Sequence, residues 1–126
     1  MGIDEVVYEE NYDSHSNSDR IIATLVNGET NGFLVGQVRM AQFKQDAVIG
    51  GHYREYPEIY GVIGNATFTL EDIKTKERRD YELKTGDRLS VPPLVALKIK
   101  AVSGTLVVAC SPKADRELKS HKYQIN

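Results

Sequence analysis

The chain has 126 residues, enough for one ordinary domain, and a formal net charge of −2. The near balance of 16 Lys and Arg against 18 Asp and Glu argues against a nucleic-acid binder with a basic face and against a polybasic membrane anchor. A single cysteine, Cys110, rules out an internal disulfide and a cysteine-rich zinc site, and no apolar run near the N-terminus resembles a signal peptide, so we expect a cytoplasmic protein.

The chain pattern predicts one β-domain at residues 20–112 between two terminal segments. Residues 1–19 are expected to form a tail that ends in a polar link, because 13–19 holds residue types that favour loops. Apolar and polar residues then alternate in short runs separated by turn residues, which is typical of an all-β sandwich or barrel. The expected strands cover 20–26, 33–43, 47–54, 58–63, 66–71, 80–84, 88–91, 95–101 and 105–110.

The C-terminal segment, 113–126, has a different pattern. Ser111 is suited to cap a helix and Pro112 to occupy its first position, so a short helix is predicted over 113–122. We expect the tail after it to pack across the barrel or on a second subunit.

Residues 50–65 read GGHYREYPEIYGVIGN and contain the most informative spacing. His52 and Glu58 are spaced as the first histidine and the acid of the first conserved motif of the cupin superfamily, which this segment resembles. Asn65 stands where that motif has a glycine, and asparagine tolerates the left-handed backbone of such a turn.

A second segment, 86–97, reads GDRLSVPPLVAL and resembles the second cupin motif. Gly86 and Pro92 match it, Leu94 replaces a glycine and Leu97 replaces a histidine. The resemblance covers roughly residues 33–110. It implies a single-domain antiparallel β-barrel of the double-stranded β-helix or jelly-roll type, and a homodimer, because small cupins commonly pair through edge strands.

The resemblance also implies where a metal would bind. A cupin metal site uses two histidines and the glutamate of the first motif with the histidine of the second, and here Arg54 and Leu97 occupy two of those positions. A protonated arginine has no lone pair for a metal, and leucine has no ligand atom. His52 and Glu58 remain, one fewer than the usual minimum of three. We therefore expect no metal and no other cofactor, with a divalent metal held by an irregular ligand set as the alternative.

Four residues form the predicted site. His52 and Arg54 lie two apart on one expected strand and Glu58 and Tyr60 two apart on the next, so each pair shares a face. In the cupin arrangement these faces meet inside the barrel. His52 is the tentative catalytic base. Arg54 matches a carboxylate or phosphate, and Glu58 and Tyr60 complete the expected ligand-binding set.

Each of these residues also has a purely structural interpretation. Arg54 and Glu58 can form a buried ion pair that joins two strands, and His52 can be a hydrogen-bonded core residue. Leu97 lies on the apolar face of 95–101, where packing in the core is the simplest role. Cys110 ends an apolar strand and is predicted to be a buried thiol.

Three hypotheses for function follow. The resemblance includes small cupins that isomerise or epimerise sugars or nucleotide sugars without metal, by proton transfer through a pocket histidine. This predicts a barrel that binds a small anionic or carbohydrate ligand. The alternatives are a non-catalytic ligand sensor or structural dimer, and a metal-dependent isomerase or oxygenase with irregular ligands. No nucleic-acid or membrane partner is expected under any of them.

Overall fold

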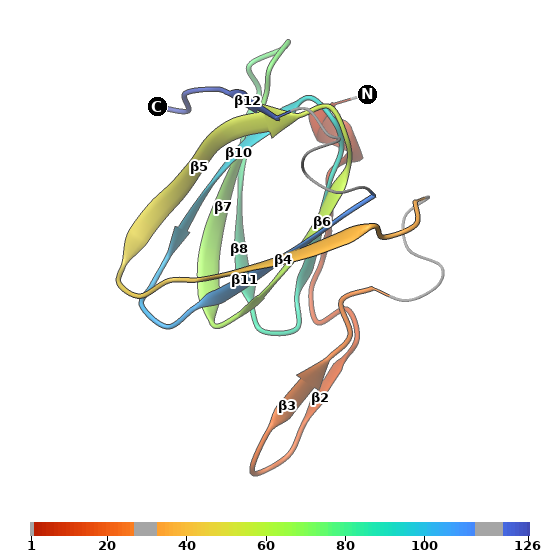
Figure 1. Cartoon of the computed structure of the whole chain (residues 1–126), viewed down its shortest axis with the longest axis vertical. Helices are drawn as coiled ribbons and strands as arrows, with labels where there is room; N and C mark the ends of the chain where they lie inside the picture. Colours follow the sequence, from red (N-terminus) through yellow and green to blue (C-terminus); the bar gives the residue numbers. More distant parts are fainter. Residues whose placement is uncertain (1, 27–32, 113–119) are drawn as a thin grey trace.

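The computed structural model describes residues 2–26, 33–112 and 120–126 and consists almost entirely of antiparallel strands (Figure 1). Two five-stranded sheets enclose the core, and a short hairpin projects from one end of the barrel. In spatial order the first sheet is β1 (Val7–Glu9), β9 (Arg88–Val91), β6 (Glu58–Ile63), β11 (Leu106–Ser111) and β4 (Gln37–Gln42). The second sheet is β12 (Ser120–Lys122), β5 (Ala47–Arg54), β10 (Val95–Ala101), β7 (Asn65–Asp72) and β8 (Arg78–Lys84). The hairpin is β2 (Ser14–Ser16) with β3 (Ile21–Ala23).

The inner faces of the two sheets form the core. Leu97 on β10 pairs with Leu70 on β7, Ile99 with Phe68, and all four are at most 3% exposed. Tyr60 from the opposite sheet meets the Phe68 ring edge-on, with centroids 5.3 Å apart. The alternation in the sequence thus gave the correct inward face of 95–101, and Leu97 packs in the core as predicted.

Residues 3–9 contribute to the fold, whereas we expected residues 1–19 to form a tail. Ile3, in the short 3-10 helix η1 (Ile3–Glu5), is 2% exposed, and its N–H donates to Asp72 Oδ2 at 3.1 Å. β1 then pairs with β9, so that Val7 lies opposite Ser90. Acidic residues surround these few apolar side chains, and the mixed composition hides the alternation. The predicted polar link and the run after it form the β2–β3 hairpin.

The expected C-terminal helix is wrong where the structure describes it. Residues 120–122 form the strand β12, which pairs with β5, and the predicted positions 113–119 lie outside the described residues. Pairing with a sheet edge is a tertiary effect that overrides weak local helix propensity. Within the described ranges, no helix has the length and apolar character needed to cross a membrane.

Candidate active site

A cavity of about 240 Å³ between the two sheets brings the four predicted residues together. His52 and Arg54 come from β5 and Glu58 and Tyr60 from β6, and Leu97 on β10 forms part of the wall. β5 and β6 belong to different sheets, so the residues meet across the barrel interior as the resemblance implied.

A larger hollow of about 780 Å³ lies elsewhere and contains none of the four residues. Its lining includes Thr67, Glu82 and Lys100, which are paired across the outward face of the second sheet. We therefore place the candidate site in the smaller cavity, where residues with acid–base and anion-binding chemistry converge.

A β-bulge in β5 turns His52 and Arg54 toward the cavity. Ile49 pairs with Ile99 and Gly50 with Lys98, but His52 pairs with Leu97, so one extra residue, Gly51, enters the strand. Without it, strict alternation would place His52 outward. Gly50 has φ +109°, and a Cβ there would lie 2.7 Å from Lys98 Cα. The glycines before His52 therefore allow the bulge that aims the site.

Arg54, Glu58 and Tyr60 form a buried network. Arg54 Nε donates to Glu58 Oε1 at 3.0 Å, and the Tyr60 hydroxyl donates to the same oxygen at 2.6 Å. Glu58 is 6% and Tyr60 3% exposed. Burial and then the neighbouring Glu58 raise the pKa of Tyr60 well above its usual value, so the phenol stays protonated. Burial lowers the pKa of Arg54, but Glu58, Tyr60 and Tyr56 together raise it by more, so the net shift is upward and Arg54 stays a cation.

His52 lies between β10 and β12, opposite Leu97 and Lys122. The residue is held by other interactions, and its Nε2 atom is buried without a hydrogen-bond partner among the described residues. Of the described histidines, His52 is the one in the cavity wall. His15 lies in the projecting hairpin, and His121 lies in β12 beside Glu55.

Arg39 on β4 is a cavity residue that the sequence analysis did not select. It is exposed, and it shares the cavity-facing side of β4 with Ala41. Mixed alternation across 33–43 prevented a prediction of which side chains face inward. A second fixed positive charge therefore borders the same cavity as Arg54.

Among the described residues, no group of three or more His, Cys, Asp or Glu side chains is placed to hold a metal ion. Glu58 Oε1 already accepts hydrogen bonds from Arg54 and Tyr60, and the Arg54 cation occupies the position of a motif ligand.

The turn positions of the two motifs differ in detail from expectation. Gly64, and not Asn65, has the positive φ, at +117°. Leu94 has φ +66°, so leucine adopts the left-handed conformation at the position where the motif has glycine. The Leu94 N–H donates to the Arg54 carbonyl oxygen at 2.9 Å, which ties this turn to the end of β5.

No protein-family model and no curated protein matches the sequence. Solved structures do resemble the fold. A dTDP sugar isomerase from Desulfovibrio desulfuricans G20 superposes with a TM-score of 0.79 at 15% identity, covering 95% of this chain and 84% of that one. The fold is a cupin-type jelly roll.

Two further structures have the same fold. A sugar 3,4-ketoisomerase from Thermoanaerobacterium thermosaccharolyticum, in complex with TDP, gives a TM-score of 0.73 at 15% identity and covers 91% of this chain and 85% of its own. A dTDP-6-deoxy-D-glucose-3,5-epimerase from Legionella pneumophila Philadelphia 1, in complex with dTDP-4-keto-L-rhamnose, gives a TM-score of 0.74 at 14% identity. The match covers 97% of this chain and 74% of that one. At these identities the likeness establishes the fold alone.

Proposed function

We propose that this protein is an isomerase that acts on a keto sugar carried by a nucleotide, with His52 as the base. The observation that carries the proposal is the single cavity that holds His52, Arg54, Glu58 and Tyr60. Solved structures of this fold that are described as sugar-nucleotide isomerases and epimerases support the substrate class.

The size of the cavity defines what enters it. At about 240 Å³ it is smaller than the roughly 300–1,000 Å³ typical of pockets for drug-sized ligands. A sugar ring suits this space, and the nucleotide would remain outside its mouth. Arg39 borders the same cavity from β4 and is exposed, and a guanidinium group matches the geometry of phosphate oxygens.

The proposed reaction moves a carbonyl group between neighbouring carbons. His52 removes the proton from the carbon next to the carbonyl, and the electron pair moves to the carbonyl oxygen, giving an enediolate. The Arg54 cation stabilises that oxyanion. His52 then returns its proton to the former carbonyl carbon, and the hydroxyl proton of the neighbouring carbon moves to the enolate oxygen. The carbonyl group has shifted by one carbon with no net loss of atoms or electrons.

One base suits isomerisation better than epimerisation. Epimerisation needs a proton donor on the opposite face of the ring, and Tyr60 is the hydroxyl donor in the predicted set. Its hydroxyl already donates to Glu58 at 2.6 Å. The network therefore favours an arrangement in which Glu58 and Tyr60 orient Arg54. In this arrangement, His52 is the one side chain that transfers protons.

TDP-4-keto-6-deoxyglucose is the probe for the test, with product formation followed by NMR. The wild-type protein is expected to convert it, and His52→Asn is expected to reduce turnover by about 10²–10⁴-fold with an unchanged fold. His15→Asn, in the exposed hairpin, is the matched control and should retain full activity. Full activity of His52→Asn would contradict the mechanism. If the wild type binds the sugar nucleotide without converting it, the alternative of a non-catalytic ligand sensor is favoured. The buried Arg54–Glu58 pair is compatible with that function.

We also propose that the site works without a resident metal, because Arg54 and Leu97 occupy two ligand positions of the motif. The measurement is elemental mass spectrometry of protein purified without chelator or affinity-column metal. Substoichiometric metal with full turnover is expected, and one tightly bound divalent ion per chain would contradict this proposal.

The predicted homodimer remains a proposal. β4 lies at the end of its sheet, and Val38 and Met40 on its outward side are 55% and 71% exposed, with Ile63 on β6 57% exposed. We propose that a second copy covers this face. Light scattering should give a dimer mass that Met40→Asp converts to a monomer, whereas Val48→Asp, on the other sheet and 57% exposed, should not. A monomeric wild type would contradict the proposal.

A further inference from the structure

The C-terminal residues 120–126, here called the strap, lie along the end of β5 that bears the site. Ser120 in β12 pairs with Arg54, and Lys122 pairs with His52. The next residue, Tyr123, donates its N–H to the Gly51 carbonyl oxygen at 2.8 Å. β10 pairs with the other side of β5, so the strap is the outer neighbour of both site residues. Without it, this end of β5 would be a sheet edge.

The strap also contacts the Arg54 side chain. Arg54 Nη1 donates to Ser120 Oγ at 2.6 Å, while Nε donates to Glu58 Oε1 at 3.0 Å. A guanidinium group is planar, so two bonds from different nitrogens fix both its position and its orientation. Glu58 supplies one of these bonds from the opposite sheet and the strap supplies the other.

The strap passes close to the bulge. Gly51 has φ +80°, and a Cβ there would lie 3.2 Å from the Tyr123 carbonyl oxygen. Gly51, the extra residue that turns His52 inward, therefore lies directly beside Tyr123. A glycine-rich strand has a weakly specified register, and at this end of β5 the strap is a second neighbour beside β10.

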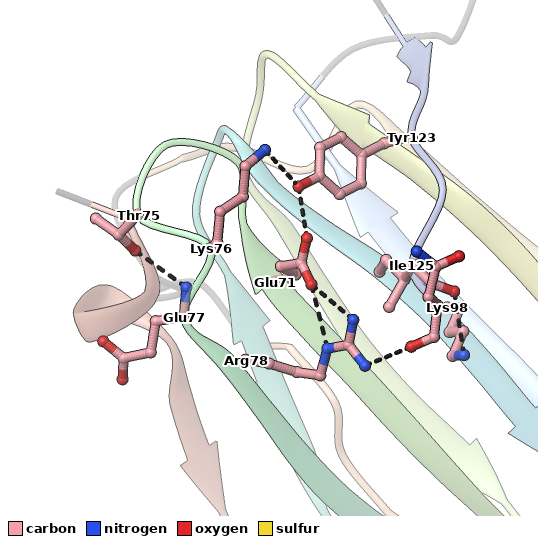
Figure 2. Close-up of polar contacts among 9 residues, drawn as sticks. Glu71, Thr75, Lys76, Glu77, Arg78, Lys98, Tyr123 and Ile125 are labelled. Carbon is pink, nitrogen blue, oxygen red and sulfur yellow. Dashed lines mark hydrogen bonds and ion pairs between the residues drawn. The ribbon is translucent and has the colours of Figure 1, made fainter.

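Tyr123 fastens the strap to the outer face of the second sheet (Figure 2). Its hydroxyl donates to Glu71 Oε2 at 2.5 Å and accepts from Lys76 Nζ at 3.0 Å. Arg78 holds the other oxygen of Glu71 through Nε at 3.1 Å and Nη2 at 2.8 Å. Glu71 is 8% exposed, whereas the Arg78 side chain is 42% exposed and the bond from Lys76 to Tyr123 lies at the surface.

The last two residues are held in the same way. Arg78 Nη1 donates to the Asn126 backbone oxygen, and Lys98 Nζ donates to the Ile125 oxygen at 3.3 Å (Figure 2). The Ile125 side chain is 7% exposed. Side chains from β7, β8 and β10 thus fasten the strap, and the strap in turn pairs with β5 at the cavity.

We propose that the strap is a positioning element of the candidate site and that Tyr123 is its latch. The inference rests on the proposed function for its catalytic consequence, although its structural part does not need it. A displacement of about 1 Å in a reacting group can lower a rate by about 10²-fold, so the register of β5 bears directly on how His52 and Arg54 meet a substrate.

Hydrogen exchange at residues 50–54 tests the structural part without any ligand. Tyr123→Ala should speed exchange there by about tenfold or more while the amides of β9 keep their protection. Tyr8→Phe is the matched control for Tyr123→Phe, because the Tyr8 hydroxyl also donates to a carboxylate, Asp87 Oδ2, at 3.0 Å. Tyr123→Phe should loosen 50–54 and Tyr8→Phe should leave them unchanged. Unchanged exchange in both Tyr123 variants would overturn the proposal.

Kinetics on TDP-4-keto-6-deoxyglucose test the catalytic part. Tyr123→Ala should lower kcat by about tenfold or more with a smaller change in KM, and Tyr8→Phe should stay within about twofold of the wild type. If Tyr123→Ala loses protection from hydrogen exchange in every strand, the test relies on Tyr123→Phe and Ser120→Ala instead. These two variants should also lower kcat more than they change KM, by a smaller factor than Tyr123→Ala. Equal effects of Tyr8→Phe and Tyr123→Phe on kcat would overturn a positioning role. A wild type without turnover would refute the proposed function, and the exchange comparison would still decide the role of the strap.

Discussion

Removing the Tyr60 hydroxyl tests the buried network that organises the site. Tyr60→Phe deletes the donor to Glu58 Oε1 at 2.6 Å and leaves the ring, with its contact to Phe68, in place. Glu58 keeps its bond from Arg54 Nε at 3.0 Å, so the carboxylate loses one donor and keeps another at that oxygen. The substitution therefore isolates a single hydrogen bond to a charged group in the barrel interior.

The expected loss is about 1.5–2 kcal/mol, the lower part of the range for hydrogen bonds to charged groups, because Arg54 still neutralises Glu58. An unfolding entropy of about 2.1 cal/mol/K per residue makes 1 kcal/mol equivalent to about 4 °C for this chain, so the Tm should fall by about 6–8 °C. Burial raises the pKa of Tyr60, and the effect should therefore be constant between pH 6 and 9.

A double-mutant cycle shows whether the loss belongs to this pair. Tyr60→Phe, Glu58→Gln and the double variant are compared by urea unfolding, and we expect a coupling free energy of about 1 kcal/mol. A coupling near zero would mean that Tyr60 and Glu58 do not interact in solution, and it would refute the argument that Glu58 and Tyr60 orient Arg54.

Three further predictions concern the fold around the site. Gly50→Ala should lower the free energy of unfolding in urea by about 3 kcal/mol or more, because Gly50 has φ +109° and an added Cβ would meet the Lys98 backbone. The control is Gly104→Ala, which has φ +89° but no atom within 4 Å of an added Cβ and should cost only about 1–2 kcal/mol. Equal costs for the two variants would contradict the bulge. Ile3→Ala should lower the free energy of unfolding by about 2–4 kcal/mol, because Ile3 is 2% exposed in the core. An unchanged free energy of unfolding would contradict the packing of Ile3 in the core. Burial and hydrogen bonding to a carboxylate raise the pKa of Tyr8 to about 12, so the folded state keeps this proton to a higher pH than the unfolded chain does. The free energy of unfolding should therefore keep the full Tyr8 contribution below pH 10 and fall as the pH rises toward 12. A flat profile between these pH values would contradict the raised pKa of Tyr8.

The middle of the chain could be predicted from the sequence because its strands are amphipathic. The strand bounds of 47–54, 58–63, 88–91 and 95–101 match the predicted ones, and Cys110 is buried, at 1% exposure, as expected. The motif spacing also identified the residues that meet in the cavity. Alternation shows that His52 and Arg54 share a face, but it cannot show that a bulge at Gly50 and Gly51 turns that face inward.

The terminal segments could not be predicted because their structure depends on partners distant in the sequence. β12 forms where residues 120–122 meet the edge of β5, some 66 positions earlier, and η1 depends on a carboxylate at Asp72. Arg39 was missed for a similar reason: β4 is exposed over most of its length, including the residues that line the cavity, so no alternation marks its inner face. Short polar segments leave little pattern until the rest of the barrel is present.

Solvent deuterium incorporation tests the central claim, that His52 transfers a proton at carbon inside this cavity. TDP-4-keto-6-deoxyglucose is incubated with the protein in D₂O, and the sugar signals are followed by NMR. The wild-type protein should introduce deuterium at a carbon next to the carbonyl group, through exchange of the His52 proton with solvent, at a rate that His52→Asn lowers by about 10²–10⁴-fold and His15→Asn leaves unchanged. Incorporation that proceeds equally well in His52→Asn would contradict this claim, and so would a sugar that the wild type neither labels nor isomerises after prolonged incubation.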